Sequence, residues 1–196
     1  ACSERLEAEA GNFRQLFETE LHPLPTDVRV VLARSATGTK LSAFCFDPDP
    51  RVIQSVLENE SAGMQHARLV AFHHRNSVGL EHLAHRMAFF RDRQVQRLLL
   101  RNPQLSEGLL RRMLTNRRIL DLYKIVYDRD VPDRIRGTTR QVLRNRFTSG
   151  APDEKVEAIF SSEGRVLLHL AGVPFDGKTV GMLCARSYAS SALIQH

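Results

Sequence analysis

The sequence predicts an all-α protein, and three observations support this fold class. First, a four-residue phrase that ends in Asn occurs at 56–59, 99–102 and 142–145, at two intervals of 43 residues. Second, the apolar residues between these phrases recur at helical spacing. Third, only residues 27–33 resemble a strand, and they fit a short helix equally well. Repetition at this period is typical of an α-solenoid, in which successive short helices bury one another's apolar faces.

The first element expected is an amphipathic helix over residues 3–21. Its apolar side carries Leu6, Phe13, Leu16, Phe17 and Leu21. Such a helix cannot bury this side alone, so we expect it to cover the end of a helical array. Residues 1–33 are therefore predicted to be N-terminal capping helices within a single domain.

The array itself is expected over residues 34–196, as a right-handed superhelix of repeats of about 43 residues. Apolar residues at helical spacing predict helices near 78–87, 109–114 and 119–126. Turn signals separate them at 47–50, 103 and 130–133, and again at 150–152 and 172–174. The last copy is the most degenerate, as expected of a capping repeat.

The recurring Asn of the phrase has two interpretations. Asn59, Asn102 and Asn145 each follow two apolar residues and a charged residue, which is typical of a helix end and its turn. The alternative is a row of Asn side chains that contacts a ligand. The helix-end interpretation is favoured, since Asn is a common turn residue.

The period and two sequence segments carry a resemblance to known repeat families. Residues 98–114, LLLRNPQLSEGLLRRML, are followed at 120–136 by LDLYKIVYDRDVPDRIR. Together they resemble HEAT and armadillo repeats, and in particular the degenerate HEAT-like or leucine-rich-repeat-variant arrays of bacterial proteins. The resemblance covers about residues 34–196 and implies a HEAT-like α-solenoid. Most such families are protein scaffolds, and a few, such as HEAT-like alkylpurine DNA glycosylases, bind DNA.

Positive charge is concentrated in the middle of the chain. Residues 51–150 carry nineteen basic and nine acidic side chains, whereas residues 1–50 carry five and eight. Seven of the eight arginines between residues 51 and 107 have another Arg 43 residues later. A basic middle section predicts an anionic partner.

Two arginine triads are the candidate binding residues. Arg93, Arg97 and Arg101 are spaced to lie on one side of a helix, and Arg136, Arg140 and Arg144 repeat them one period later. If the two helices stack, the six guanidinium groups share one patch. An acidic protein or nucleic-acid phosphates would bind such a patch. The alternative is structural: arginines paired with aspartates in ladders between repeats, or a solvated helix face.

Other chemistry is weakly indicated. Five histidines at 66–85 include pairs on one helix face, but no strong metal motif is present, so solvated or buried histidines are favoured over a metal site. No nucleophile elbow or phosphate loop occurs. Asp128 and Asp130 are the candidate general bases of a glycosylase-like cleft. Neither a cofactor nor a metal is predicted.

The sequence also bounds the setting of the protein. Three widely spaced cysteines form no metal or disulfide pattern, which favours a reducing cytoplasmic compartment. No apolar run is long enough to span a membrane. No signal segment is recognised, although Cys2 leaves a lipid-attached terminus as an alternative.

The functional prediction is a non-enzymatic helical-repeat scaffold that binds a protein partner through the arginine surface. Nucleic-acid binding by the same arginines is the alternative, and a HEAT-like DNA repair enzyme is a weaker third.

Overall fold

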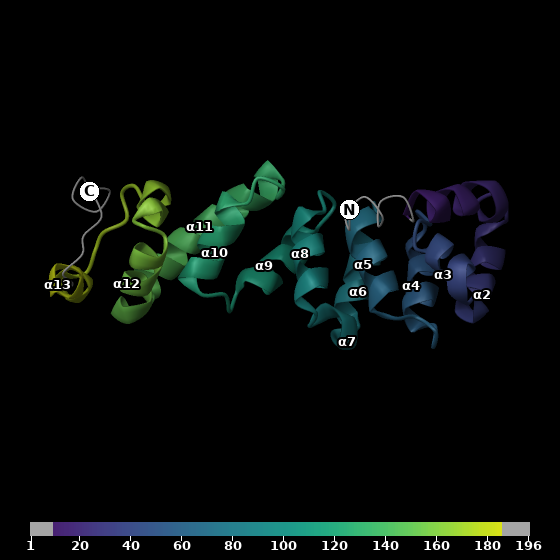
Figure 1. Ribbon diagram of the computed structural model, residues 1–196, viewed down its shortest axis with the longest axis horizontal. Coiled ribbons are helices and arrows are strands. Elements are labelled where there is room, and N and C mark those ends of the chain that lie inside the picture. The colour runs from purple at the N-terminus through teal and green to yellow at the C-terminus, as the bar shows by residue number, and fades with distance from the viewer. Residues whose placement is uncertain (1–9, 186–196) are drawn as a thin grey trace. The chain divides into compact units, whose positions relative to one another are not determined.

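The computed structural model describes residues 10–185, and this part of the chain is helical with no strand (Figure 1). The predicted all-α class is therefore confirmed for these residues. The chain divides into two compact units, Ala1–Leu109 and Leu110–His196. The division falls inside the predicted array at 34–196, and each unit is described by itself below.

The first described elements of unit 1 are helical turns from residue 10, a π-helical turn η1 (Phe17–Leu21), α2 (Thr26–Ser35) and α3 (Gly38–Phe44). Phe17 and Leu21 are buried, as the amphipathic pattern predicts, whereas Leu6 lies outside the described residues. The strand-like stretch at 27–33 is part of α2.

The rest of unit 1 contains α4 (Pro50–Glu58), α5 (Met64–His73), α6 (Ser77–His85), α7 (Met87–Phe90) and α8 (Arg93–Arg101). Among these helices, α2 packs against α4, α4 against α6, and α5 against α8. Each helix is too short to be stable alone, so tertiary packing provides most of its stability. The core includes Leu41, Phe44, Ile53, Leu57, Leu80, Leu83 and Leu99, all almost fully buried.

Helix positions repeat with the sequence period. The helices α4 and α8 begin 43 residues apart and end 43 residues apart, and α5 is followed at the same interval by the start of α9 (Glu107–Leu114). Asp49 and Asp92 cap α4 and α8: their carboxylates accept hydrogen bonds from the N–H groups of Arg51 (2.8 Å) and Val95 (2.9 Å). The repeated phrase thus marks an equivalent helix in both copies.

Asn59 and Asn102 end these two helices in the same way. The amide of Asn59 donates to the carbonyls of Ala33 (2.8 Å) and Ala36 (2.9 Å) at the end of α2. The amide of Asn102 donates to the carbonyls of Ala71 and His74, both at 2.9 Å, at the end of α5. Both Asn side chains are buried. They satisfy carbonyls at a helix terminus that have no partner within that helix.

Unit 2 contains α10 (Ile119–Tyr127), α11 (Asp133–Ser149), α12 (Pro152–Ser161), a 3-10 turn η2 (Arg165–His169) and α13 (Gly177–Ala185). In this unit α10 packs against α11 and α12, and α12 packs against η2 and α13. Its core includes Leu122, Ile135, Leu143, Phe147, Val156 and Ile159.

The third copy of the phrase differs from the first two. Asn145 is exposed and lies inside α11, so the prediction that it ends a helix is wrong. A helix end is favoured at Asn102 because Pro103 follows it, and proline disfavours helical backbone in the preceding residue. After Asn145 the next such signals are Gly150 and Pro152, and α11 continues to Ser149.

Candidate anion-binding surfaces

The helix α8 presents its predicted arginines on the side opposite its buried residues. Val95 and Leu99 are fully buried in unit 1. Arg93 and Arg97, one turn apart, are exposed, and Arg101 is half-buried. Side chains four residues apart lie on the same face of a helix, so the two exposed guanidinium groups are available to one ligand.

Within the described residues, Arg93 and Arg97 lack the carboxylate partners that three other arginines of unit 1 have. Among residues 10–185, neither side chain is paired with a carboxylate. By contrast, Arg29 meets Asp47 at 2.9 Å, Arg51 meets Asp27 at 3.2 Å and Asp49 at 3.3 Å, and Arg68 meets Asp92 at 3.4 Å. Of these three, only Arg68 belongs to the arginines that recur with the period, and it pairs with Asp92, an aspartate available for such a ladder. A ladder does not account for Arg93 or Arg97.

The equivalent arginines of α11 have different contacts. Arg136 forms an ion pair with Asp133 within the same helix. Arg144 donates to the carbonyls of Ala171 (2.8 Å) and His169 (3.5 Å), beside the end of η2. Arg140 is exposed, whereas Arg136 and Arg144 are half-buried. Arg144 thus has a structural role that the sequence pattern did not indicate.

The structure places the two triads in different units, Arg93–Arg101 in the first and Arg136–Arg144 in the second. The single patch of six guanidinium groups remains a prediction. The candidate anion-binding residues of each unit are the exposed members of its triad: Arg93 and Arg97 on α8, and Arg140 on α11.

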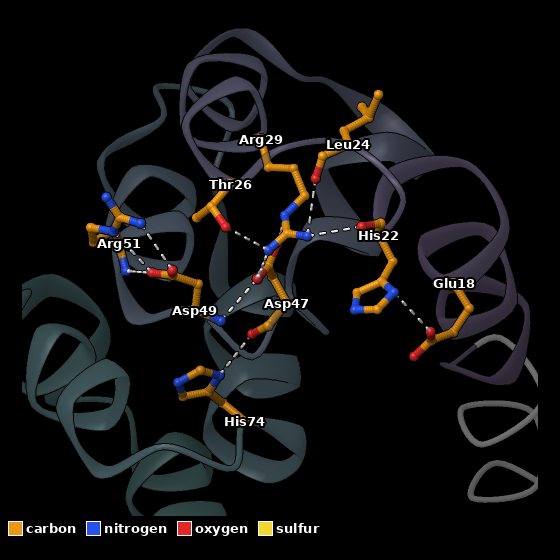
Figure 2. Close-up of polar contacts among 9 residues, drawn as sticks. All are labelled: Glu18, His22, Leu24, Thr26, Arg29, Asp47, Asp49, Arg51 and His74. Atoms are coloured by element: carbon orange, nitrogen blue, oxygen red, sulfur yellow. Dashed lines mark hydrogen bonds and ion pairs between the residues drawn. The ribbon is translucent and has the colours of Figure 1, made fainter.

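A buried polar cluster in unit 1 was missed from the sequence (Figure 2). The carboxylate of Asp47 is fully buried and pairs with the guanidinium of Arg29, which also donates to the carbonyls of His22 (3.0 Å) and Leu24 (3.3 Å). The Nδ1–H of His74 donates to the carbonyl of Asp47 at 3.1 Å. The cluster ties α2, the turn after α3 and the end of α5 together, which is a structural role.

Close packing surrounds His74 on its other side. A Cβ atom at Gly79 would lie 2.0 Å from Nε2 of His74, so the absence of a side chain at residue 79 makes room for the ring. Burial lowers the pKa of His74 to about 4. Burial raises the pKa of Asp47, while the N–H of Asp49 and the guanidinium of Arg29 oppose this rise.

Unit 2 contains a counterpart of this cluster. The ammonium of Lys155, itself buried, meets the carboxylate of Asp176 at 2.7 Å. The hydrogen bond from Lys155, together with hydrogen bonds from Thr179, holds the pKa of Asp176 well below its usual range. The sequence did contain a signal for both clusters, because the dipeptide Phe-Asp occurs at 46–47 and again three periods later at 175–176.

The histidines at 66–85 form no metal site in the described part of the chain, where no group of three or more metal-binding side chains is found. His66 accepts a hydrogen bond from the N–H of Gly63 at 3.0 Å, and its pKa is lowered by burial. Burial, together with the charges of Arg14 and Arg75, lowers the pKa of His73 to about 4. Buried histidines, the interpretation favoured from the sequence, thus describe His66 and His74.

Several other predicted groups have contacts of their own. Asp128 accepts a hydrogen bond from the N–H of Asp130 at 3.0 Å, which fixes the turn before α11. Cys45 is buried, and burial raises the pKa of its thiol.

A surface hollow of about 560 Å³ in unit 1 is lined by Arg34, Ser35, Glu58, Asn59, Glu60 and Ser61. Within residues 10–185, no helix is both long enough and apolar enough to cross a membrane.

Comparison of the chain with known protein families, with curated proteins and with solved structures finds no match. The resemblance to HEAT-like repeats therefore remains a prediction from the sequence.

Proposed function

We propose that the chain is a non-enzymatic helical-repeat scaffold that binds an acidic protein partner through the exposed arginines of α8. One observation carries the proposal. Arg93 and Arg97 are exposed on one helix face with no carboxylate partner among residues 10–185, although other arginines of the same unit are paired with aspartates.

Electrostatic repulsion supports this interpretation. Like charges one helical turn apart destabilise a helix by a few tenths of a kcal/mol, about as much as an opposite-charge pair stabilises it. The only carboxylate next to them in sequence, Asp92, already caps α8 and pairs with Arg68. An external anion would therefore remove a repulsion that the fold leaves uncompensated.

The architecture proposed for this scaffold is a HEAT-like α-solenoid located in the cytoplasm. Its support is the 43-residue interval between the bounds of α4 and α8 and between the starts of α5 and α9. In such an arrangement equivalent helices lie side by side, and an extended partner can contact several repeats at once.

Fluorescence anisotropy with two labelled probes of equal charge tests the proposal: a Glu-rich peptide and a short DNA duplex. We expect the wild-type chain to bind the peptide more tightly than the duplex. The double substitution Arg93→Ala/Arg97→Ala should weaken peptide binding roughly tenfold, because two charge-assisted contacts are lost. Binding should also weaken as salt is raised, since exposed charges are screened.

The double substitution Arg34→Ala/Lys40→Ala is a matched control. Both side chains are exposed, both belong to unit 1, and the change in net charge is the same. Equal loss of binding in the two double variants would show that net charge, and not α8, binds the peptide. Tighter binding of the duplex, lost on substitution of Arg93 and Arg97, would favour the nucleic-acid alternative. No binding of either probe at low salt would refute the proposal.

A further inference from the structure

Two tyrosines of α10 form a stacked pair at the surface of unit 2. The ring centroids of Tyr123 and Tyr127 lie 5.9 Å apart with an interplanar angle of 28°. Tyr123 is buried, with 7% of its surface exposed, whereas Tyr127 is 59% exposed. The buried ring supports the exposed one, so Tyr127 presents a large aromatic surface to solvent.

A third ring lies against the buried tyrosine of this pair. The centroid of His169, at the end of η2, lies 6.0 Å from that of Tyr123. The backbone at this point is held in place by Arg144, which donates to the carbonyls of His169 and Ala171. Next to His169 in sequence, Leu168 is 74% exposed.

A positive charge lies on the face of α11 that contacts the end of η2. Arg140 precedes Arg144 by one turn of α11, so both side chains lie on the same face of the helix. Burial is the main cause of the lowered pKa of His169, and the positive charge of Arg140 contributes to it. Arg140 is exposed and is paired with no carboxylate among residues 10–185.

The aromatic pair is absent from the equivalent helix of unit 1. One period of 43 residues earlier, Leu80 and Ala84 occupy the positions of Tyr123 and Tyr127, and both are buried. The arginine at residue 140, by contrast, does have its counterpart at residue 97. Unit 2 therefore combines an arginine that follows the repeat with an exposed aromatic surface that does not.

We propose that Tyr127, His169 and Arg140 form a binding site for single-stranded nucleic acid, in which a base stacks on Tyr127 and Arg140 contacts a neighbouring phosphate. Exposed aromatic rings bind bases largely independently of sequence, and guanidinium groups match phosphate oxygens in geometry. An acidic peptide would use the arginine but not the flat ring, and a duplex hides the faces of its bases. The residues of this site are different from the arginines of α8.

Anisotropy of the full chain with labelled oligothymidylate and oligouridylate of about 12 nucleotides, against a duplex of the same length, tests the site. We expect both single strands to bind more tightly than the duplex. Tyr127→Ala should weaken single-strand binding roughly 5- to 100-fold, as is typical for the loss of one stacked base. Tyr127→Phe keeps the ring and should retain most of the affinity. Arg140→Ala should weaken binding and reduce its dependence on salt.

Lys178→Ala is the control for charge, since Lys178 is an exposed cation of α13 in the same unit. It should leave binding unchanged. The proposal is overturned if wild type binds no single strand at low salt, if Tyr127→Ala binds like wild type, or if the duplex binds as tightly as the single strands. It is also overturned if Arg93→Ala/Arg97→Ala, rather than Arg140→Ala, abolishes single-strand binding. None of these results depends on whether α8 binds an acidic peptide.

Discussion

The helices α8 and α11 carry the same arginine spacing and the same Asn, yet the structure uses these residues differently. In α8, Asn102 is buried at the helix end, and Arg93 and Arg97 are exposed and unpaired among residues 10–185. In α11, Asn145 is exposed in mid-helix and Arg144 binds two backbone carbonyls. A residue that keeps its place in a repeat therefore does not keep its role. The role depends on which polar groups the surrounding elements bring close.

The largest difference in stability between substitutions in the two regions is expected at Asn102 and Asn145. Asn102→Ala leaves the carbonyls of Ala71 and His74 without their donor, and these groups lie in the buried part of unit 1. We expect the free energy of unfolding to fall by about 2–4 kcal/mol, because each buried polar group left unpaired costs about 1–3 kcal/mol. Urea unfolding followed by circular dichroism measures the change.

Asn145→Ala is the matched control at the equivalent position. Its side chain is exposed and makes no contact that shapes a helix end. We expect a change within about 0.5 kcal/mol, and alanine's higher helix propensity could make it slightly stabilising. Equal losses for the two variants would contradict the distinction drawn between α8 and α11.

Acid should destabilise unit 1, because the imidazole of His74, at the end of α5, is buried and its pKa is lowered by that burial. The pKa of His74 is about 4 in the folded chain and about 6.5 when the chain unfolds. Between these values the unfolded chain binds a proton that the folded chain does not, so the free energy of unfolding decreases as the pH falls. The contribution of His74 reaches about 3 kcal/mol by pH 4.

His74→Asn retains an N–H donor near the carbonyl of Asp47 but does not titrate. Its free energy of unfolding should therefore change less between pH 7 and about pH 4 than that of wild type. His85→Asn, at an exposed histidine of α6, should keep the wild-type dependence. If the pH dependence of His74→Asn matched that of wild type, the acid sensitivity would have to come from other groups, including His66 and His73.

The smallest difference in stability between substitutions in α8 and in α11 is expected at the arginines. Arg144→Ala removes two hydrogen bonds to backbone carbonyls near the end of η2, and we expect a loss of about 1–2 kcal/mol, since the groups are partly exposed to water. Arg97→Ala removes an exposed side chain without a paired carboxylate, and should change stability by less than about 0.5 kcal/mol. Thermal unfolding of the two variants compares these effects directly. A larger loss for Arg97→Ala would indicate a structural role for α8's arginines.

Several features of the protein were correctly predicted from the sequence. Apolar residues at helical spacing predicted the all-helical class of residues 10–185, and Asn59 and Asn102 stand at the ends of α4 and α8, as expected. The turn signal at 47–50 lies directly before α4, where the carboxylate of Asp49 caps the helix. These features are local: spacing, capping and turn signals act within a few residues, so the sequence alone specifies them.

Only the tertiary structure decided the environment of the charged groups. Arg29 and Arg68 meet aspartates 18 and 24 residues away, and Arg144 meets carbonyls beyond the next helix. The exposed pairing of Tyr127 with Tyr123 and the burial of the Arg29–Asp47 ion pair likewise depend on packing. Hydrogen bonds and desolvation depend on distances of a few ångströms between segments that are remote in sequence. A repeat pattern sets the spacing of residues along the chain, but it does not set the distances between remote segments in space.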